Sequence, residues 1–404
     1  MATTPSDGTD DLSRPLRSRD PRVVVIGAGY AGAHAAVAAA RAGGVEVTVI
    51  DQDGRHGFLP RMAAVAAGRL RTSAARAPLS ELLQVPVEVL AGRAVRLDDE
   101  AGTVTLADAT TVAADAMVVA AGSGSPAGSV PGSARYAATL HTPDDALALR
   151  RRLQRTTRLL IVGAGATGVQ LAAEVAAHRP GTEVHLLEIA GRVLPAEPAQ
   201  LARDATRTLR RVGVHLHLAT EVARVDQRGV VLAEGDRLDG TVVWAGGWVA
   251  DARALLPDAP TQDGRVIVTG DLRVSGLERV LAAGDVAAHR DLVGRLLPMS
   301  AQIASQAGAV AGANAAALAT GRQTRRARLL ELGRIIDLGD RGVGRIGPVP
   351  LGWGPTDRLV PLVHRAIDLR HLWQLGGPAV ALGHAPGGST VATTPPRPPL
   401  YAVS

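Results

Sequence analysis

The chain has 404 residues, of which 46% are apolar and 20% charged, a composition that suits a globular protein of two or three domains. It contains no Cys, which excludes disulfides, thiolate nucleophiles and Cys-bound metals, so redox chemistry would require a bound cofactor. The formal net charge is +6, but the Arg residues alternate with Asp and Glu and aromatic residues make up only 2%, which argues against nucleic-acid binding.

The N-terminal residues 1–20 are polar and lack the apolar core of a signal peptide, so we expect a disordered tail there. No uninterrupted apolar run in the sequence is long enough to span a bilayer. The sequence therefore predicts a cytoplasmic protein.

Residues 22–51 read as a strand, a glycine turn, an Ala-rich helix and a second strand that ends in an acid. In "VIGAGYAG", Gly27 permits the tight turn, Gly29 lets the backbone approach a pyrophosphate, and Gly32 lets helix and strand pack closely. This pattern predicts a dinucleotide-binding fold. The alternative is a glycine turn that serves packing alone.

The helix after this turn is expected to begin at Tyr30 and Ala31, where unpaired N–H groups and the helix dipole favour a phosphate. Asp51, at the end of the second strand, is placed to bind ribose hydroxyls. Both features strengthen the prediction of a nucleotide at the first turn.

The pattern occurs again in "IVGAGATGVQ", residues 161–170, with its own three glycines and an acid after the next strand: Gly163, Gly165, Gly168 and Glu188. An acid at this position accepts hydrogen bonds from a 2'-hydroxyl and repels a 2'-phosphate, which predicts NADH in preference to NADPH. Arg192 lies nearby and would soften that preference.

Three later segments, residues 115–125, 240–250 and 279–287, each carry an apolar strand into small residues and glycine. Such strand ends lie where parallel sheets bind ligands, so we predict cofactor contacts at Gly122, Gly246, Gly284 and Asp285. The alternative for Asp285 is a helix N-cap.

We therefore predict an α/β protein with two nested Rossmann-like folds. The first fold is expected at residues 21–135 and 276–345, the second at 136–275, and a C-terminal extension at 346–404. One fold would hold a nucleotide permanently and the other would exchange a second one, which suggests hydride transfer from a nicotinamide to a flavin.

The motifs "GAGYAG", "FLPRMAAVAAGRL", "VVAAGS", "VGAGATGVQLAAEV", "VVWAGG", "LAAGDVA" and "LPMSAQIASQAG", in this order, resemble those of the two-dinucleotide-binding-domain flavoprotein reductases. Among these reductases, the sequence is most similar to the type II NADH:quinone dehydrogenases. The resemblance implies that the first fold binds FAD, that the second binds NADH, and that a quinone or quinone-like small molecule accepts the electrons. It also implies that Gly27, Gly29, Gly32, Asp51 and Asp285 hold FAD and that Gly163, Gly165, Gly168 and Glu188 hold NADH.

A long Ala-rich helix is expected after Ser300, which is a suitable N-cap, and it carries Gln302 and Gln306 on one face. In the resembling family, an Ala-Gln-x-x-x-Gln pattern lines the quinone pocket, and Ala301, Gln302 and Gln306 reproduce it. The alternative is an amphipathic helix with two solvated glutamines.

Gln170 stands where the family usually has Glu, a residue proposed there to help transfer protons. An amide binds a carbonyl but does not exchange a proton near neutral pH. Glu174, one helical turn further, is either a substitute or a surface or packing residue. We expect His34, His56 and His289 to be structural, and we predict no metal site.

Residues 356–377 predict a helix with apolar residues towards one side and Arg365, Asp368 and His371 towards the other; the apolar set is Leu359, Leu362, Val363, Ala366, Leu369 and Trp373. Its mixed charges and single Trp make a poor membrane anchor, so at most weak peripheral contact with the inner membrane face is expected. A homodimer contact and a cover over the flavin are the alternatives. Two other functions also remain open: a flavin reductase of a specialised metabolite, and a nicotinamide-sensing flavoprotein without acceptor turnover.

Overall fold

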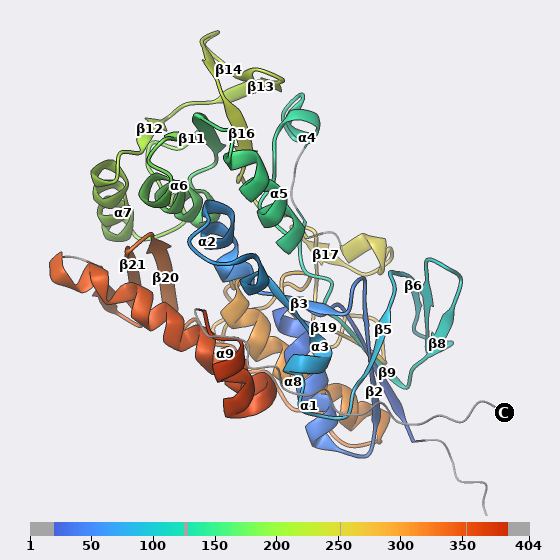
Figure 1. Ribbon diagram of the computed structural model, residues 1–404. Coiled ribbons are helices and arrows are strands. Elements are labelled where there is room, and N and C mark those ends of the chain that lie inside the picture. Colours follow the sequence, from blue (N-terminus) through green and yellow to red (C-terminus); the bar gives the residue numbers. More distant parts are fainter. Residues whose placement is uncertain (1–19, 125–127, 251, 353, 387–404) are drawn as a thin grey trace, which may run out of the picture.

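The computed structural model describes residues 20–124, 128–250, 252–352 and 354–386, and nearly all of the predicted N-terminal tail and residues 387–404 lie outside these ranges. Two parallel sheets form the framework (Figure 1). The first has the order β19-β9-β1-β2-β5, with β1 (Arg22–Ile26), β2 (Glu46–Asp51), β5 (Glu88–Ala91), β9 (Ala116–Val119) and β19 (Val280–Ala282). The second has the order β12-β11-β10-β16, with β10 (Arg158–Val162), β11 (Glu183–Glu188), β12 (His215–Leu218) and β16 (Thr241–Trp244).

Each sheet follows from its sequence, because the central strands are continuous apolar runs and parallel sheets are buried on both faces. In β1, Val23, Val24 and Val25 are fully buried. The chain leaves the first sheet after β9, builds the second, and returns through β19, which pairs in parallel with β9. This nesting confirms the predicted α/β class with two Rossmann-like units.

Smaller elements surround these sheets. The strands are β3 (Arg55–Gly57), β4 (Arg76–Pro78), β6 (Ala94–Asp98), β7 (Thr103–Leu106), β8 (Thr111–Ala113), β13 (Val222–Asp226), β14 (Gly229–Leu232), β15 (Arg237–Asp239), β17 (Thr261–Gln262), β18 (Arg265–Val266), β20 (Gly333–Leu338), β21 (Arg341–Ile346) and β22 (Val349–Leu351). The α-helices are α1 (Tyr30–Ala42), α2 (Met62–Ala67), α3 (Leu79–Leu82), α4 (Ser133–Tyr136), α5 (Pro143–Leu153), α6 (Ala166–His178), α7 (Ala199–Arg211), α8 (Ala301–Ala319) and α9 (Val360–Gly383). Short 3-10 helices are η1 (Leu59–Arg61), η2 (Thr72–Ala74), η3 (Ala252–Ala254) and η4 (Gly354–Arg358).

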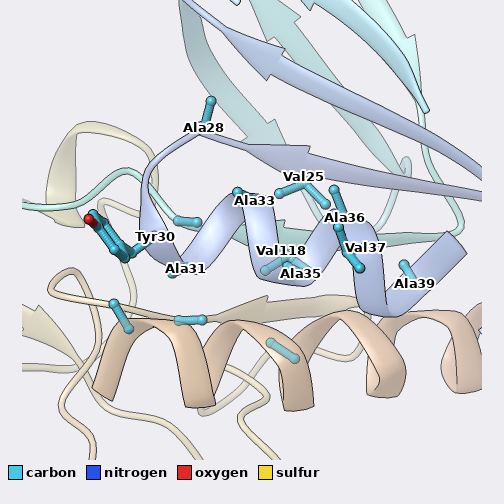
Figure 2. Packing of buried hydrophobic residues seen from close by; sticks show 14 of the residues in the cluster. Val25, Ala28, Tyr30, Ala31, Ala33, Ala35, Ala36, Val37, Ala39 and Val118 are labelled. Carbon is cyan, nitrogen blue, oxygen red and sulfur yellow. The ribbon is translucent and has the colours of Figure 1, made fainter. Parts of the chain in front are cut away.

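Helices α1 and α8 pack at backbone contact on the first sheet. A Cβ added at Gly308 would lie 2.1 Å from the Ala31 carbonyl oxygen, and one added at Gly312 would lie 2.0 Å from that of Ala35. Figure 2 shows Ala31 and Ala35 on the side of α1 that faces the neighbouring helix. Small residues on both helices therefore set their separation.

Two segments assigned to the first unit by sequence pack mainly against helices of the second. Helix α2 packs on α5 and α6, and β20 packs on α6. Ile336 and Leu338 of β20 and Val343 of β21 share a buried cluster with the strands of the second sheet. The domain boundaries that we derived from the sequence stay a prediction.

Helix α9 has one buried and one exposed side, but the predicted apolar side faces outward, and Arg365 of the predicted polar side is exposed as well. Asp368 and His371 are buried, whereas Leu362 and Trp373 are 55% and 59% exposed. The inner side is completed by Leu372 and Leu375. A kink at Gly376 and Gly377, which have non-helical backbone angles, interrupts the helix before its end at Gly383. Within the part of the chain that the structure describes, no helix is long and apolar enough to cross a membrane.

We predict that Gly312→Ala lowers the free energy of unfolding by about 1–3 kcal/mol, because the new methyl group would meet the backbone of α1. The matched control is Gly383→Ala, which adds a methyl group to a helix position with nothing within 4 Å. The control should leave stability unchanged or raise it by up to about 1 kcal/mol through helix propensity. Urea unfolding monitored by circular dichroism measures both. Equal midpoints for the two variants would contradict the backbone contact.

Candidate functional site

The first glycine turn joins β1 to α1 in the predicted strand–turn–helix geometry. Gly27 has a φ of 101°, and a Cβ there would lie 2.5 Å from the Ala120 carbonyl oxygen. A Cβ at Gly32 would lie 1.8 Å from the Gly27 carbonyl oxygen. Both positions therefore require glycine for conformation or packing, as the sequence pattern predicts.

The second turn, between β10 and α6, has nearly the same geometry. Gly163 has a φ of 103°, and a Cβ at Gly168 would lie 1.9 Å from the Gly163 carbonyl oxygen. Gly246, at the end of β16, lies under this turn, since a Cβ at Gly163 would lie 2.7 Å from it. The sequence repeat thus corresponds to a repeat of structure.

Both turns leave open space where a phosphate would approach. A Cβ added at Gly29, at Gly165 or at Gly122 would meet no atom within 4 Å. The first N–H groups of α1 and α6 have no partner within their helices, and they favour an anion. The residues present therefore fit a dinucleotide pyrophosphate at each turn.

The two predicted ribose acids each accept a hydrogen bond from the second residue of their glycine turn. Asp51 accepts from the Ala28 amide at 2.8 Å, and Glu188 accepts from the Ala164 amide at 2.7 Å. The other oxygen of Glu188 accepts from the Ala190 amide at 2.9 Å. These bonds fix the two carboxylates beside the turns, and their contact with a ribose stays a prediction.

Gly122, Gly284 and Asp285 gather at the carboxyl end of the first sheet. A Cβ at Gly284 would lie 2.9 Å from the Ala31 Cβ, which places this glycine against the start of α1. Asp285 accepts a hydrogen bond from Ser123 Oγ at 2.9 Å. Burial raises the pKa of the Asp285 carboxyl, and the Ser123 hydrogen bond opposes this shift. No helix begins at Asp285 in the described residues, so its alternative role as a helix N-cap is wrong.

The two units meet at a polar crossing that sequence patterns did not reveal. Gly124 forms an antiparallel bridge with Val249. His141 hydrogen-bonds to the Ser123 carbonyl, and its ring lies 4.4 Å from that of Trp248. Because Ser123 also contacts Asp285, this crossing links the carboxyl edge of the first sheet to the second unit.

Ser300 is the N-cap of α8, as predicted, and its Oγ accepts from the Ile303 amide at 3.3 Å. Ala301 is the first residue of the helix. Gln306 donates to the Leu330 carbonyl at 2.9 Å and accepts from the Leu330 amide at 3.0 Å. Gln302 accepts from the Leu332 amide at 3.2 Å. Both glutamines thus hold the segment that leads to β20, and their contact with an acceptor stays a prediction.

Gln170 lies in the second turn of α6 and is partly exposed. Glu174, one turn further, is buried and bound to Arg69 through bonds of 2.8 and 2.6 Å. It is therefore not a surface residue, and its carboxylate is occupied by a guanidinium. The structure offers Glu174 no free position from which to replace an acid at residue 170.

The three histidines expected to be structural are all buried. Burial lowers the pKa of His34, His56 and His289 to about 4 in each case. His289 Nε2 accepts from the Gly284 amide at 3.1 Å, so this ring supports the loop that carries Asp285. His34 and His56 both contact His371 of α9, a connection over more than 300 residues that no local pattern signals.

The fold and the two turns define an oxidoreductase that binds two dinucleotides. Residues 21–308 match the family model described as pyridine nucleotide-disulphide oxidoreductase, so the chain belongs to that family. This confirms the resemblance predicted from the motifs. The redox-active cysteine pair implied by the family's description is absent, because the chain has no Cys.

Relatives with established names share much of the chain. Type II NADH:quinone oxidoreductase NdhA of Mycobacterium tuberculosis is 34% identical over 66% of this chain and 66% of its own length. Ndh of the same organism, also a type II NADH:quinone oxidoreductase, is 31% identical over 68% of this chain and 69% of its own. Demethylphylloquinone reductase NdbB of Synechocystis is 27% identical over 80% of this chain and 85% of its own length.

Solved structures support the same fold. NDH2 from Plasmodium falciparum in complex with NADH superposes with a TM-score of 0.76 and 14% identity, covering 89% of this chain and 96% of that one. A ferredoxin reductase from Rhodopseudomonas palustris superposes with a TM-score of 0.71 and 22% identity, covering 81% of this chain and 82% of that one. At these identities the likeness concerns the fold alone.

We predict that Glu174→Gln destabilises the protein by about 3 kcal/mol, because the Arg69 guanidinium would keep its charge and lose its partner. The Glu174 side chain is 2% exposed and the Arg69 side chain 21%, so water replaces the lost interaction only in part. The control is Glu46→Gln in the open Arg22–Glu46 pair, where the Glu side chain is 48% exposed. That change should cost less than about 1 kcal/mol. Denaturant titrations compare the two, and similar costs would show that the buried pair contributes no more than a surface pair.

Proposed function

We propose that this protein is an FAD-dependent NADH dehydrogenase that passes electrons to a quinone or quinone-like small molecule. The observation that carries this proposal is the pair of matched glycine turns, each with open space above it and a carboxylate fixed beside it. The names of the relatives support the donor and the acceptor class. Together, the bound cofactors supply hydride transfer and the storage of two electrons, which protein side chains without Cys cannot provide.

The residues of the first turn hold FAD. Gly29 gives the pyrophosphate access to the amides at the start of α1, and Asp51 binds the ribose. Asp285 and Gly122 lie at the sheet edge over which the rest of the cofactor extends. The start of α8 directs its positive dipole end toward this edge, which favours negative charge by roughly 0.3–2 kcal/mol.

The residues of the second turn bind NADH. Gly165 admits the pyrophosphate, and Glu188 accepts from the free 2'-hydroxyl of the adenosine ribose. A 2'-phosphate would lie beside this buried carboxylate, so NADPH is disfavoured. Arg192 Nη2 donates to the Pro195 carbonyl at 2.6 Å, whereas its Nη1 is buried without a hydrogen-bond partner, so the charged guanidinium would soften this preference.

The acceptor lies near α8 and residue 170. Gln170 can orient a carbonyl of the acceptor but cannot supply a proton, and the Glu174 carboxylate is committed to Arg69. Protons for the reduced acceptor would therefore have to come from water or another group.

We place the protein in the cytoplasm, in weak peripheral contact with the inner membrane through the outward side of α9. That side exposes Leu359, Leu362 and Trp373, and Arg365 and Arg370 are exposed on the same helix. Apolar side chains with neighbouring guanidinium groups suit an anionic lipid surface. A second copy of the chain is the other occupant that would cover these residues, and size-exclusion chromatography would reveal it.

The purified protein should be yellow and release FAD on acid precipitation, because no Cys is present for covalent attachment. Anaerobic NADH should bleach the flavin, and a quinone such as menadione should restore it. We expect kcat/KM for NADH to exceed that for NADPH by about tenfold or more. Bleaching without reoxidation by any quinone would instead support a nicotinamide sensor. A preference for NADPH would show that Glu188 does not face the 2' position.

Gln170→Glu should leave reduction of the flavin by NADH nearly unchanged and accelerate its reoxidation by a quinone. A carboxyl at this partly exposed position can deliver protons, which the amide cannot. Stopped-flow spectroscopy of the two half-reactions separates these effects, and Gln170→Met is the control that removes the amide without adding an acid. A change confined to the reductive half-reaction would assign residue 170 to the nicotinamide instead.

A further inference from the structure

Three histidines from distant segments form one hydrogen-bonded chain beside the first glycine turn. His56 Nδ1 lies 2.8 Å from the Ala28 carbonyl oxygen, and His56 Nε2 lies 3.0 Å from His371 Nε2. His371 Nδ1 lies 3.0 Å from His34 Nε2. All three rings are buried, and the Tyr30 ring stacks on His371 at 4.3 Å.

The Ala28 carbonyl fixes the direction of every hydrogen bond in this chain. A carbonyl only accepts, so His56 carries its proton on Nδ1 and, when neutral, accepts at Nε2. His371 must then donate from Nε2 and accept at Nδ1, and His34 must donate from Nε2. At most one excess proton fits, because a second would place two hydrogens between one pair of nitrogens.

His371 is the central member, and it comes from a part of the chain beyond the family match at residues 21–308. Helix α9 is held in place by a second buried contact, in which Arg61 Nε donates to Asp368 Oδ2 at 2.8 Å. His371 and Leu375 face inward with Asp368, and Leu375 joins the apolar core of the first unit. The C-terminal helix therefore reaches the backbone of the turn through polar contacts as well as apolar ones.

We propose that His371 is a positioning residue for the flavin site: it bridges His34 and His56 and thereby fixes the Ala28 carbonyl within the first glycine turn. The inference rests on the proposed function, since it assumes that this turn binds FAD. It makes the C-terminal helix a component of the cofactor site and not only a surface for a partner. Loss of the bridge leaves His56 Nε2 and His34 Nε2, two buried ring nitrogens, without their hydrogen-bond partner.

The arrangement also makes flavin retention depend on pH. Burial lowers the pKa of His34 and His56 to about 4 and lowers that of His371 as well. The neighbouring imidazoles lower the pKa of His34 and His371 further. Charged neighbours also shift these pKa values. Arg41 of α1 and Arg370 of α9 lower the pKa of His34, and Arg61 of η1 lowers those of His56 and His371, whereas Asp51 of β2 raises that of His56. Asp368 of α9 acts on the neighbouring Tyr30. The hydrogen bond to the Ala28 carbonyl and, less strongly, the Asp51 carboxylate favour a protonated His56 and raise its pKa.

A fall in pH therefore weakens the assembly of the three histidines. When the three histidines are apart and solvated, their imidazoles have ordinary pKa values near 6.5 and take up protons as the pH falls below about 6.5. When they are hydrogen-bonded to one another and buried, they do not take up protons in this range. Assembly is therefore fully favoured above that pH and weakens as the pH falls towards about 4. Because more than one proton is taken up when the histidines separate, their assembly should depend on pH more steeply than the titration of a single histidine.

The test compares FAD binding to wild-type protein, His371→Leu and His371→Gln, with Leu382→Ala as the control on an outward position of the same helix. Fluorescence titration of the apoprotein near pH 7.5 should give a Kd about tenfold or more higher for His371→Leu. His371→Gln can still accept from His34 and donate to His56, so its Kd should stay within about threefold of wild type. The control should bind like wild type.

Two further measurements separate positioning from general stability. Between about pH 7 and pH 5, the wild-type Kd should rise steeply, whereas His371→Gln should show a shallower dependence because one titrating ring is gone. Hydrogen exchange of the apoprotein should show faster exchange in α9 of His371→Leu, with β10 and α6 unchanged. If His371→Leu fails to fold, the His371→Gln pH profile alone carries the test.

The outcomes are distinct. Wild-type protein that binds no FAD overturns the proposed function, and this inference with it. Wild-type protein that binds FAD with the same Kd and the same pH profile as the folded His371 variants overturns the inference alone.

Discussion

The close approach of α8 to α1 is the constraint on which the first nucleotide site depends. Gly308 and Gly312 bring α8 to within backbone contact of Ala31 and Ala35, and Gly284 meets the Ala31 side chain from another direction. This packing carries the capped N-terminus of α8 to the edge where the glycine turn opens. If the two helices lay further apart, the N-terminus of α8 would no longer reach the edge of the first sheet beside this turn.

The sequence predicted those features whose signal is local. Each glycine turn, its ribose acid and its flanking strands lie within about 30 residues, the usual span of one strand–helix–strand unit, and the required geometry limits which residues fit. The Ser300 cap could be identified for the same reason, since its oxygen serves an amide three residues away. Positions such as Gly27 and Gly163, where a side chain would overlap the backbone, leave the least freedom and were the most predictable.

Features that depend on distant partners could not be predicted. The helical period separates the two sides of α9, but it does not say which side is buried, and here buried Asp368 is compensated by Arg61 from far earlier in the chain. Glu174 looked like a candidate acid until Arg69 was placed beside it. His371 belongs to the same category, because a histidine in an amphipathic helix has no local sign that two other imidazoles will meet it.

The two nearly identical turns have different surroundings. The first residues of α1, Tyr30 and Ala31, are buried beneath α8, α9 and the histidine chain, whereas Ala166 and Thr167 at the start of α6 are partly exposed. At the glycine that would meet a pyrophosphate both turns are open, since Gly29 is exposed and Gly165 is partly exposed. The two sites therefore differ in what packs against the helix that follows each turn, not in the turns themselves.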